Sequence, residues 1–472
     1  MTGRGAVWYD IREKTKGSEN EMETIAAIST PRGKGGIAVI RISGDEAIAV
    51  AARIFIPFGK TKVAELDGGR CIYGTIVDGD ERIDDGVLTM FRAPRSYTGE
   101  DTVELSCHGG LLVTARVLEA ALSNGAAPAG AGEFTKRAFL NGKITLTEAE
   151  AVGGMIDAKT DAHLRISRNQ LRGSLSNVLT DITDKLTELV ASVYAYIDYP
   201  DEDLTDLSVA ELRDSLVAIK ARICELMGSY RYGKAITEGV SAAIIGKPNA
   251  GKSSLLNALC GYERAIVTEL EGTTRDVITE EVNVGGVLLH LADTAGIRES
   301  DDKIEKMGID RSRAQIDESE LIIAVFDGNT ELSAEDREIL ELLVPVREKV
   351  IAVVNKSDLQ SLPQHELDST FETVVTVSAK AGDGITTLVK RICEKCGELD
   401  AGGEVIVNAR QNSALKTAAT HIDNAIESLD AFTQDVAAMD IEQALARLGE
   451  IDGRAVSEDV VARIFSKFCV GK

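Results

Sequence analysis

The stretch VSAAIIGKPNAGKSSLLNAL, residues 240–259, decides the fold of the middle of this chain. An apolar run leads directly into Gly246-Lys247-Pro248-Asn249-Ala250-Gly251-Lys252-Ser253 and then into a helical segment, the context that a phosphate-binding loop requires. Gly246 and Gly251 let the backbone curl so that its N–H groups converge on a phosphate. Lys252 supplies a positive charge, and Ser253 supplies a hydroxyl for magnesium. Taken alone, the motif favours phosphate binding over a plain glycine turn.

Further apolar runs on both sides of this loop predict a parallel sheet. The runs 240–245, 288–291, 321–326, 350–354 and 374–377 alternate with helical segments as far as about residue 396. Alternation of short buried strands with helices is typical of a doubly wound α/β domain.

Four more motifs follow in the order that guanine-nucleotide binding needs. Asp293-Thr294-Ala295-Gly296 offers a carboxylate to the magnesium shell, and Gly272-Thr273-Thr274-Arg275-Asp276 offers Thr274 as a second hydroxyl on magnesium. In Asn355-Lys356-Ser357-Asp358, the Asp358 carboxylate accepts from two adjacent donors that guanine has and adenine lacks, and Ser378-Ala379-Lys380 completes the base pocket. The residues expected to bind GTP are Asn249, Ala250, Gly251, Lys252, Ser253, Ser254, Thr268, Gly272, Thr273, Thr274, Asp293, Thr294, Ala295, Gly296, Asn355, Lys356, Asp358, Ser378, Ala379 and Lys380.

The residue after this glycine motif cannot orient a water molecule. Many small G proteins carry Gln at the position of Ile297, which neither donates nor accepts a hydrogen bond. Another group must position the attacking water, although for any one alternative taken singly a solvated loop charge is the favoured interpretation. The alternatives are Arg298, Glu299, Asp301, Asp302 and Glu305.

Composition restricts the compartment and the partners. A chain of 472 residues needs several domains, and 52 Lys plus Arg against 76 Asp plus Glu give a net charge of -24, which repels nucleic-acid backbones unless a local basic patch or a partner holds them. Seven cysteines without disulfide-scaffold density predict free thiols in a reducing, cytoplasmic setting. The mixed charges of residues 1–20 predict a disordered extension, and the longest apolar run, 189–197, is too short to span a membrane.

The regions on either side of the α/β pattern have different sequence patterns. Residues 23–146 mix short β-like runs, such as 37–42 and 103–105, with glycines, which predicts an α+β unit. Residues 147–232 follow a helical period that the Tyr199-Pro200-Asp201 stretch must interrupt. A helical period returns after Gly402, so the α/β unit looks inserted into a helical domain. The helical face is predicted from Leu175, Leu179, Ile182, Leu186, Leu189, Val193 and Ile197, and later from Ile441, Leu445, Leu448, Ile451, Val461, Ile464, Phe465 and Phe468.

With these motifs in place, the chain resembles the tRNA uridine-5-carboxymethylaminomethyl modification GTPases, the MnmE/TrmE family, from about Glu21 to Lys472. The resemblance rests on 30–44 (TPRGKGGIAVIRISG), 97–101 (YTGED), 107–110 (CHGG), 132–143 (GEFTKRAFLNGK), 197–200 (IDYP) and 468–472 (FCVGK). It implies a multidomain α/β, α and α+β protein, in which a P-loop G domain is inserted into a discontinuous helical domain. The implied segments are a disordered extension 1–20, a folate-binding and dimerisation domain 21–146, a first helical segment 147–238, the G domain 239–398, and a second helical segment 399–472 that ends in the cysteine motif.

The resemblance also implies site residues, position by position. Arg41, Glu104, Lys143 and Lys472 match residues that contact a tetrahydrofolate derivative, 5-formyl- or 5,10-methylene-tetrahydrofolate; a surface charge or a structural ion pair is the alternative for each. Asn249, Thr268, Leu270 and Thr273 match ligands of a potassium ion at the nucleotide. Glu305 matches the acidic residue that positions the attacking water through a bridging water, which would answer the question raised by Ile297.

The terminal cysteine has two readings. Cys469 sits near the chain end, but Gly471 and Lys472 fit a prenylation signal poorly. A structural thiol on a C-terminal helix is one alternative, and thiolate attack on a uracil ring, which the resemblance favours, is the other. The Cys393-x-x-Cys396 pair has no second pair nearby, so incidental cysteines are expected rather than a zinc site.

The resemblance finally implies a function and a set of partners. The expected activity is potassium-dependent GTP hydrolysis, with Mg²⁺, coupled to pairing of two G domains. It would gate the addition of a carboxymethylaminomethyl or aminomethyl group, from a folate one-carbon unit, to C5 of a wobble uridine in tRNA. Expected partners are a second copy of the chain, a flavin-containing (FAD) subunit that completes a heterotetramer, and tRNA, with no membrane. The rival is a regulatory GTP switch in ribosome or RNA assembly, which would have no use for Arg41, Glu104, Lys143 or Cys469.

Overall fold

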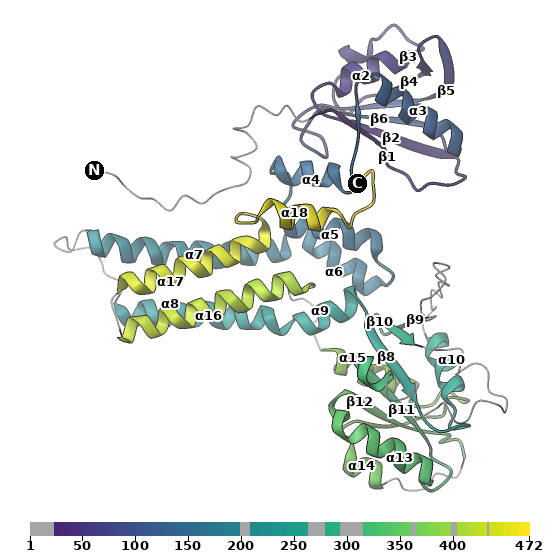
Figure 1. Cartoon of the computed structure of the whole chain (residues 1–472), viewed down its shortest axis with the longest axis vertical. Coiled ribbons are helices and arrows are strands. Elements are labelled where there is room, and N and C mark those ends of the chain that lie inside the picture. Colours follow the sequence, from purple (N-terminus) through teal and green to yellow (C-terminus); the bar gives the residue numbers. More distant parts are fainter. Residues whose placement is uncertain are drawn as a thin grey trace. The chain divides into compact units, whose positions relative to one another are not determined.

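The computed structural model describes residues 23–198, 208–262, 279–292, 315–359, 365–397, 404–431 and 434–472. Two compact units emerge. The first contains the described chain up to Gly153 together with Gln170–Val217 and Thr417–Lys472, and the second contains Gly154–Asn169 and Ala218–Lys416. The units therefore interleave along the sequence (Figure 1).

The first unit begins with a seven-stranded sheet in the order β3-β4-β5-β6-β2-β1-β7. All neighbours are antiparallel except β1 and β7. Ile40, Ile42 and Leu105 are fully buried against α2 and α3, which makes one face of the sheet the core of this α+β unit, as the sequence predicts. The elements are β1 Ile25–Ile28, β2 Ile37–Ser43, α2 Ala47–Ile54, β3 Phe55–Pro57, η1 Val63–Glu65, β4 Cys71–Asp78, β5 Glu81–Phe91, β6 Thr102–His108, α3 Leu111–Ser123 and β7 Ala127–Pro128.

Helices follow the sheet. The long helix α7 packs against α17, as Figure 1 shows. Six of the seven residues predicted for the helical face of α7, from Leu175 to Val193, are buried, which confirms the helical period; the side chain of Ile197 and the Tyr199-Pro200-Asp201 stretch lie outside the described residues. The helices are α4 Glu133–Leu140, α5 Leu146–Asp157, α6 Asp161–Leu171, α7 Ser174–Asp198, α8 Val209–Gly228, α9 Tyr230–Thr237, α16 Ala409–Ala431, α17 Gln434–Asp452 and α18 Glu458–Phe465.

The second unit contains a six-stranded sheet in the order β13-β12-β11-β8-β10-β9, parallel except for β9. The predicted strands are all present. The elements are β8 Val240–Ile245, α10 Lys252–Tyr262, β9 Thr279–Val284, β10 Val287–Ala292, β11 Leu321–Asp327, α13 Ala334–Leu343, η2 Val344–Lys349, β12 Val350–Asn355, α14 His365–Thr370, β13 Val374–Thr376 and α15 Ile385–Cys396.

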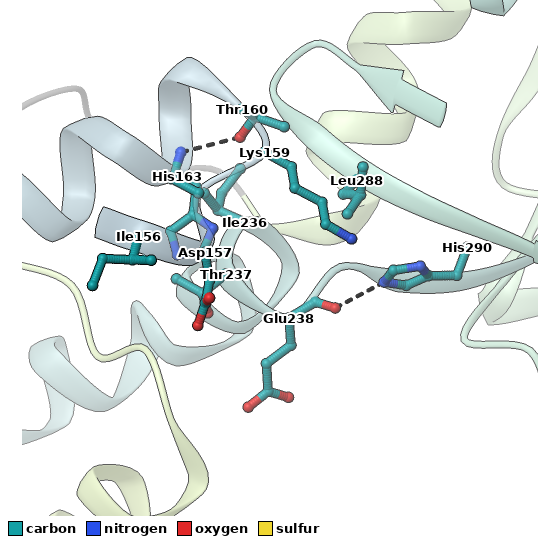
Figure 2. A pocket seen from close by; sticks show the side chains of 11 residues that line it. Ile156, Asp157, Lys159, Thr160, His163, Ile236, Thr237, Glu238, Leu288 and His290 are labelled. Atoms are coloured by element: carbon teal, nitrogen blue, oxygen red, sulfur yellow. Dashed lines mark hydrogen bonds between the residues drawn. The ribbon is translucent and has the colours of Figure 1, made fainter. Parts of the chain in front are cut away.

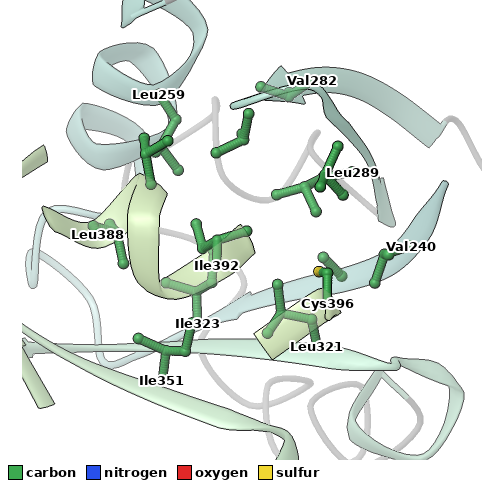
Figure 3. Packing of buried hydrophobic residues seen from close by; sticks show 14 of the residues in the cluster. Val240, Leu259, Val282, Leu289, Leu321, Ile323, Ile351, Leu388, Ile392 and Cys396 are labelled. Carbon is green, nitrogen blue, oxygen red and sulfur yellow. The ribbon is translucent and has the colours of Figure 1, made fainter. Parts of the chain in front are cut away.

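Both faces of this sheet are buried. Ile323 on β11 joins a cluster with α10 and α15, whereas its neighbour Ile322 joins a cluster with α13 and α14. Figure 3 shows Ile323 and Ile351 of the sheet packed against Ile392 and Leu388 of α15. Parallel strands covered on both faces are continuous apolar runs, which is why the sequence shows them so clearly.

The edge strand β9 was not predicted. Its sequence, Thr279–Val284 (TEEVNV), begins with three polar residues and alternates polar with apolar only from Glu281 onward, and within the sheet the strand pairs with β10. Gly285 and Gly286 close the hairpin to β10 with φ values of 61° and 90°. A Gly-Gly pair between two such runs is a hairpin signal, and it could have revealed the strand.

The core in Figure 3 predicts a stability effect. Ile392 is 0% exposed, so Ile392→Ala should lower the free energy of unfolding of the second unit by about 2–5 kcal/mol through lost apolar contact and a residual cavity. Leu164→Ala in the same unit is the control, because Leu164 is 42% exposed. Urea unfolding of the full chain measures both variants, and equal losses would contradict this packing.

Candidate functional site

The phosphate-binding loop joins the end of β8, at Ile245, to the start of α10, at Lys252. Its backbone requires small residues at two positions. A Cβ on Gly246 would lie 2.3 Å from the Val325 carbonyl oxygen, and one on Gly251, whose φ is 99°, would lie 2.1 Å from the Asn355 Nδ2. Asn249 also has a left-handed backbone, with φ 61°. The loop therefore has the tight curl that aims backbone N–H groups at one point.

The loop lysine is folded over its own loop. Lys252 Nζ donates to the carbonyl oxygens of Gly246, at 2.7 Å, and Lys247, at 2.9 Å. Burial lowers the pKa of Lys252 below its usual value. Ser253 and Ser254 follow it in the first turn of α10, where the helix dipole favours an anion.

Asn355 ties the base-reading segment to the phosphate-binding loop. It is the last residue of β12 and only 2% exposed. Its Nδ2 donates to the Ala250 carbonyl oxygen at 3.0 Å, and its Oδ1 accepts from the Ala379 backbone N–H at 3.0 Å. One side chain thus joins three predicted nucleotide-binding segments at the carboxyl edge of the sheet.

Asp358 is oriented by the third of these segments. Ser378 Oγ donates to Asp358 Oδ1 at 2.7 Å, and Ala381 N–H donates to Ser378 Oγ at 3.1 Å. The hydrogen bond from Ser378, helped by the charges of Lys380 and Lys356, holds the pKa of Asp358 below its usual value. The carboxylate is therefore ionised at neutral pH, as an acceptor for two guanine donors must be.

Several predicted site residues lie outside the described residues of the chain. For the GTP, magnesium and potassium sites these are Thr268, Leu270, Gly272, Thr273, Thr274, Asp293, Thr294, Ala295 and Gly296. For the positioning of water they are Ile297, Arg298, Glu299, Asp301, Asp302 and Glu305.

A second constellation lies on the sheet of the first unit. Arg41 on β2 and Glu104 on β6 are direct cross-strand partners. Arg41 Nη2 lies 2.8 Å from Glu104 Oε1, and Arg41 Nε donates to the same oxygen at 2.9 Å. The Arg41 guanidinium also lies 5.4 Å from the ring centre of Tyr97 and 5.5 Å from that of Phe134, within cation–π range.

The chain terminus returns to this constellation. The Phe134 N–H donates to the Lys472 carbonyl oxygen at 3.2 Å, and Val470 forms an isolated β-bridge with Ala131. The backbone of Lys472 and the side chain of Arg41 therefore both contact Phe134. Lys143 belongs to the same sequence motif as Phe134, and its Nζ donates to the Pro94 carbonyl oxygen at 2.8 Å.

The alternative that placed the terminal thiol on a C-terminal helix is wrong about its position. Helix α18 ends at Phe465, and exposed Cys469 lies beyond it, with its carbonyl oxygen accepting from Gly132 N–H at 3.3 Å. The bridge between Val470 and Ala131 draws this segment out of helical geometry.

The seven cysteines of the chain all lie among the described residues. None of them forms a disulfide bond, and among the described residues no group of three or more His, Cys, Asp or Glu side chains could hold a metal. Cys393 Sγ donates weakly to the carbonyls of Val284 and Gly285, and burial raises the pKa of Cys396 to about 12.

A pocket of about 570 Å³ lies elsewhere in the second unit, between the α5–α6 connection, the end of α9 and β10 (Figure 2). The positive charge of Lys159, which lines the pocket, is balanced by an ion pair, since Lys159 Nζ lies 2.7 Å from both carboxylate oxygens of Glu281. His290 Nε2 donates to the Glu238 carbonyl oxygen at 2.9 Å. None of the predicted site residues lines this pocket, so we interpret it as a structural feature of the place where these elements meet.

Some side chains around both sites were not predicted from the sequence. Tyr97 and Phe134 lie within the motifs that carry the family resemblance but had no assigned role. Lys247 and Asp336, which pair beside the phosphate-binding loop, had none either. These contacts have no local pattern, because the partners are far apart in the sequence.

The parallel sheet, the curled loop at its carboxyl edge and the Asn-Lys-x-Asp segment tied to that loop define a P-loop GTPase. Two family models match: "GTP-binding protein TrmE N-terminus" over residues 24–143 and "MnmE helical domain" over residues 146–469.

Curated relatives match over nearly the whole chain. The tRNA modification GTPase MnmE of Acetivibrio thermocellus is 41% identical over 95% of this chain and 99% of the relative, as is that of Clostridioides difficile. The MnmE of Symbiobacterium thermophilum is 42% identical over the same shares of both chains. The chain belongs to the MnmE family of tRNA modification GTPases. In the described ranges, no helix has the length and apolar character to cross a membrane.

The geometry of Asp358 predicts an exchange of base specificity. In Asp358→Asn, the amide can no longer accept from both guanine donors, but it can donate to the C2 carbonyl of xanthine while accepting from its N1–H. We expect GDP affinity to fall roughly a hundredfold, the scale of lost charged hydrogen bonds, and xanthosine diphosphate to bind instead. Competition against a fluorescent nucleotide measures this, with Asp368→Asn, an exposed change on α14, as control. Unchanged GDP preference would contradict the assignment.

Proposed function

We propose that this chain is the GTP-hydrolysing subunit of a complex that modifies C5 of the wobble uridine in tRNA. The observation that carries the proposal is the junction at Asn355, which joins the phosphate-binding loop to the base-reading segments in a chain of the MnmE family. The modification would add a carboxymethylaminomethyl or aminomethyl group from a folate one-carbon unit. GTP hydrolysis would control it.

The residues around the loop suit the chemistry of GTP. Lys252 and the N-terminal backbone of α10 would neutralise the β- and γ-phosphates, and Asp358 would select guanine. The Ser253 hydroxyl and the Asn249 amide oxygen are the oxygen donors that Mg²⁺ and K⁺, respectively, take. Bound there, these cations would offset the charge that develops on the phosphates during transfer. Glu305 would position the attacking water, and Thr274 would complete the magnesium site.

The second constellation suits a folate. A folate combines a flat pterin ring with an acidic tail, and the partly exposed Tyr97 offers a flat face beside the Arg41–Glu104 pair, whereas Phe134 is fully buried against the Arg41 guanidinium. Lys143 and Lys472 would hold the carboxylates of the tail. Cys469, which is exposed and close in sequence to Lys472, would contact the uridine.

The domain assignment belongs to the same proposal. The folate-binding and dimerisation domain would be 21–146, the helical domain 147–238 and 399–472, and the inserted G domain 239–398. The chain would work in the cytoplasm as a homodimer, joined by an FAD-containing partner subunit. Such a partner could also supply the positive surface for tRNA that a chain of net charge -24 lacks in bulk.

Turnover in two salts tests the hydrolysis step. We expect GTP turnover in potassium chloride to exceed turnover in sodium chloride at equal ionic strength by about a hundredfold, the scale of losing one transition-state charge partner. Glu305→Ala should abolish the turnover and leave GTP binding intact, since only the water loses its orientation. Equal turnover in both salts, or full activity of the variant, would refute the mechanism.

Binding of 5-formyltetrahydrofolate tests the second site. Arg41→Ala and Glu104→Gln should each weaken binding by about tenfold or more, because each removes a charge-assisted contact. Arg116→Ala is a matched control, since Arg116 forms an exposed ion pair with Glu81 at 2.7 Å on the same domain. Calorimetry on the full chain measures all three, and unchanged affinity in both Arg41→Ala and Glu104→Gln would sink the assignment.

A further inference from the structure

The connection from the end of β11 to the start of α13, residues 327–336, contains none of the predicted nucleotide ligands. It nevertheless contacts two of the nucleotide-binding loops. Its two ends carry carboxylates, Asp327 and Asp336, and each one holds a lysine from a different loop. Lys247 comes from the phosphate-binding loop, and Lys356 comes from the base-reading segment.

Asp336 is held in place by contacts that do not involve Lys247. Its Oδ2 accepts from Ser333 N–H at 2.9 Å and from Ser333 Oγ at 2.8 Å, forming a capping box at the start of α13. Lys247 Nζ lies 2.6 Å from the same oxygen and 3.4 Å from Ser333 Oγ. The side chains are 2% exposed for Asp336 and 16% for Lys247. A buried carboxylate at a helix N-terminus is thus a rigid anchor for the loop.

Asp327 anchors the second loop in the same way. Lys356 Nζ lies 2.7 Å from Asp327 Oδ2, and Asn329 N–H donates to Asp327 Oδ1 at 3.0 Å. Burial alone would raise the pKa of Asp327, but the bonds from Lys356 and Asn329, with the charge of Lys247, hold it below its usual value. Lys356 needs this support because its backbone is left-handed, with φ 69°.

Stability alone does not account for these pairs. Burying an ion pair costs desolvation energy that an apolar pair would avoid. Asp336 Oδ1 is moreover buried with no hydrogen-bond partner among the described residues, which carries a further cost. Lys247 stands between Gly246 and Pro248, next to left-handed Asn249, in a loop whose unconstrained backbone would have other conformations available. A fixed conformation of this loop is what the ion pair provides.

We propose that Asp336 and Asp327 are positioning residues for guanine-nucleotide binding. Asp336 holds the phosphate-binding loop through Lys247, and Asp327 holds the base-reading segment through Lys356. The inference rests on the proposed function, because it concerns the same nucleotide. The connection then sets the distance between the phosphate and the base halves of the site.

Nucleotide affinity of the full chain tests the proposal. In Lys247→Met, Ser333 still donates two hydrogen bonds to Asp336 Oδ2, so the fold should survive at a cost in stability while the loop samples other conformations. If the binding-competent loop falls to about a tenth of the population, the affinity for fluorescently labelled GDP falls about tenfold. Asp336→Asn and Asp327→Asn should weaken GDP binding similarly. Lys247→Arg should bind GDP as tightly as the unaltered chain. The rate of GTP turnover at saturating GTP should be retained in these variants, because a loss of positioning raises KM.

Lys234→Met is the matched control. Lys234 forms an ion pair of the same length, 2.6 Å, with Glu320 in the same unit, but both side chains are more exposed, at 34% and 49%. Its GDP affinity should equal that of the unaltered chain. If the unaltered chain binds no guanine nucleotide, the proposed function falls and this inference falls with it. If it binds GDP and Lys247→Met binds equally well, only the inference is overturned, even where Asp336→Asn fails to fold.

Discussion

The side chain of Asn355 is the contact on which the nucleotide site depends. It is almost fully buried at the end of β12, donates to the carbonyl of Ala250 and accepts from the N–H of Ala379. An amide carries its donor and its acceptor on separate atoms, so the Asn355 side chain can donate to a carbonyl of one loop and accept from an N–H of another, which an ionised carboxylate could not do. The phosphate-binding loop, the base-reading segment and the loop after β13 consequently form one structure rather than three independent turns.

This junction is possible because the sheet is parallel and buried on both faces. Parallel strands deliver all their carboxyl ends to one edge, and helices on both faces fix the strands in register. The loops that leave that edge are held by backbone hydrogen bonds, such as Ser357 N–H to the Val377 carbonyl oxygen, and by side chains. These side chains are Asn355 at the strand end, and Asp327 and Asp336 in the neighbouring connection. The core therefore specifies where the loops start, and buried polar contacts specify how they lie.

Much of this was predictable from the sequence, since the decisive signals are local. The apolar runs gave each parallel strand, and the motifs around Lys252, Asp358 and Ser378 gave the nucleotide loops. Edge strand β9 was missed because its pattern is weak, although Gly285 and Gly286 marked its turn. The pair of Lys247 with Asp336 spans 89 positions, and the contacts of Arg41 with Tyr97 and Phe134 arise only when the chain folds back. No local period carries such contacts.

Hydrogen exchange of the full chain with and without nucleotide tests the central claim most directly. The account predicts that GDP with Mg²⁺ slows backbone exchange together in residues 246–253, 355–358 and 378–380, because one ligand binds loops that Asn355 already joins. ADP with Mg²⁺ should leave these segments unchanged, since adenine cannot satisfy Asp358. Equal protection by ADP, or protection by GDP in only one of the three segments, would contradict a single guanine-specific site.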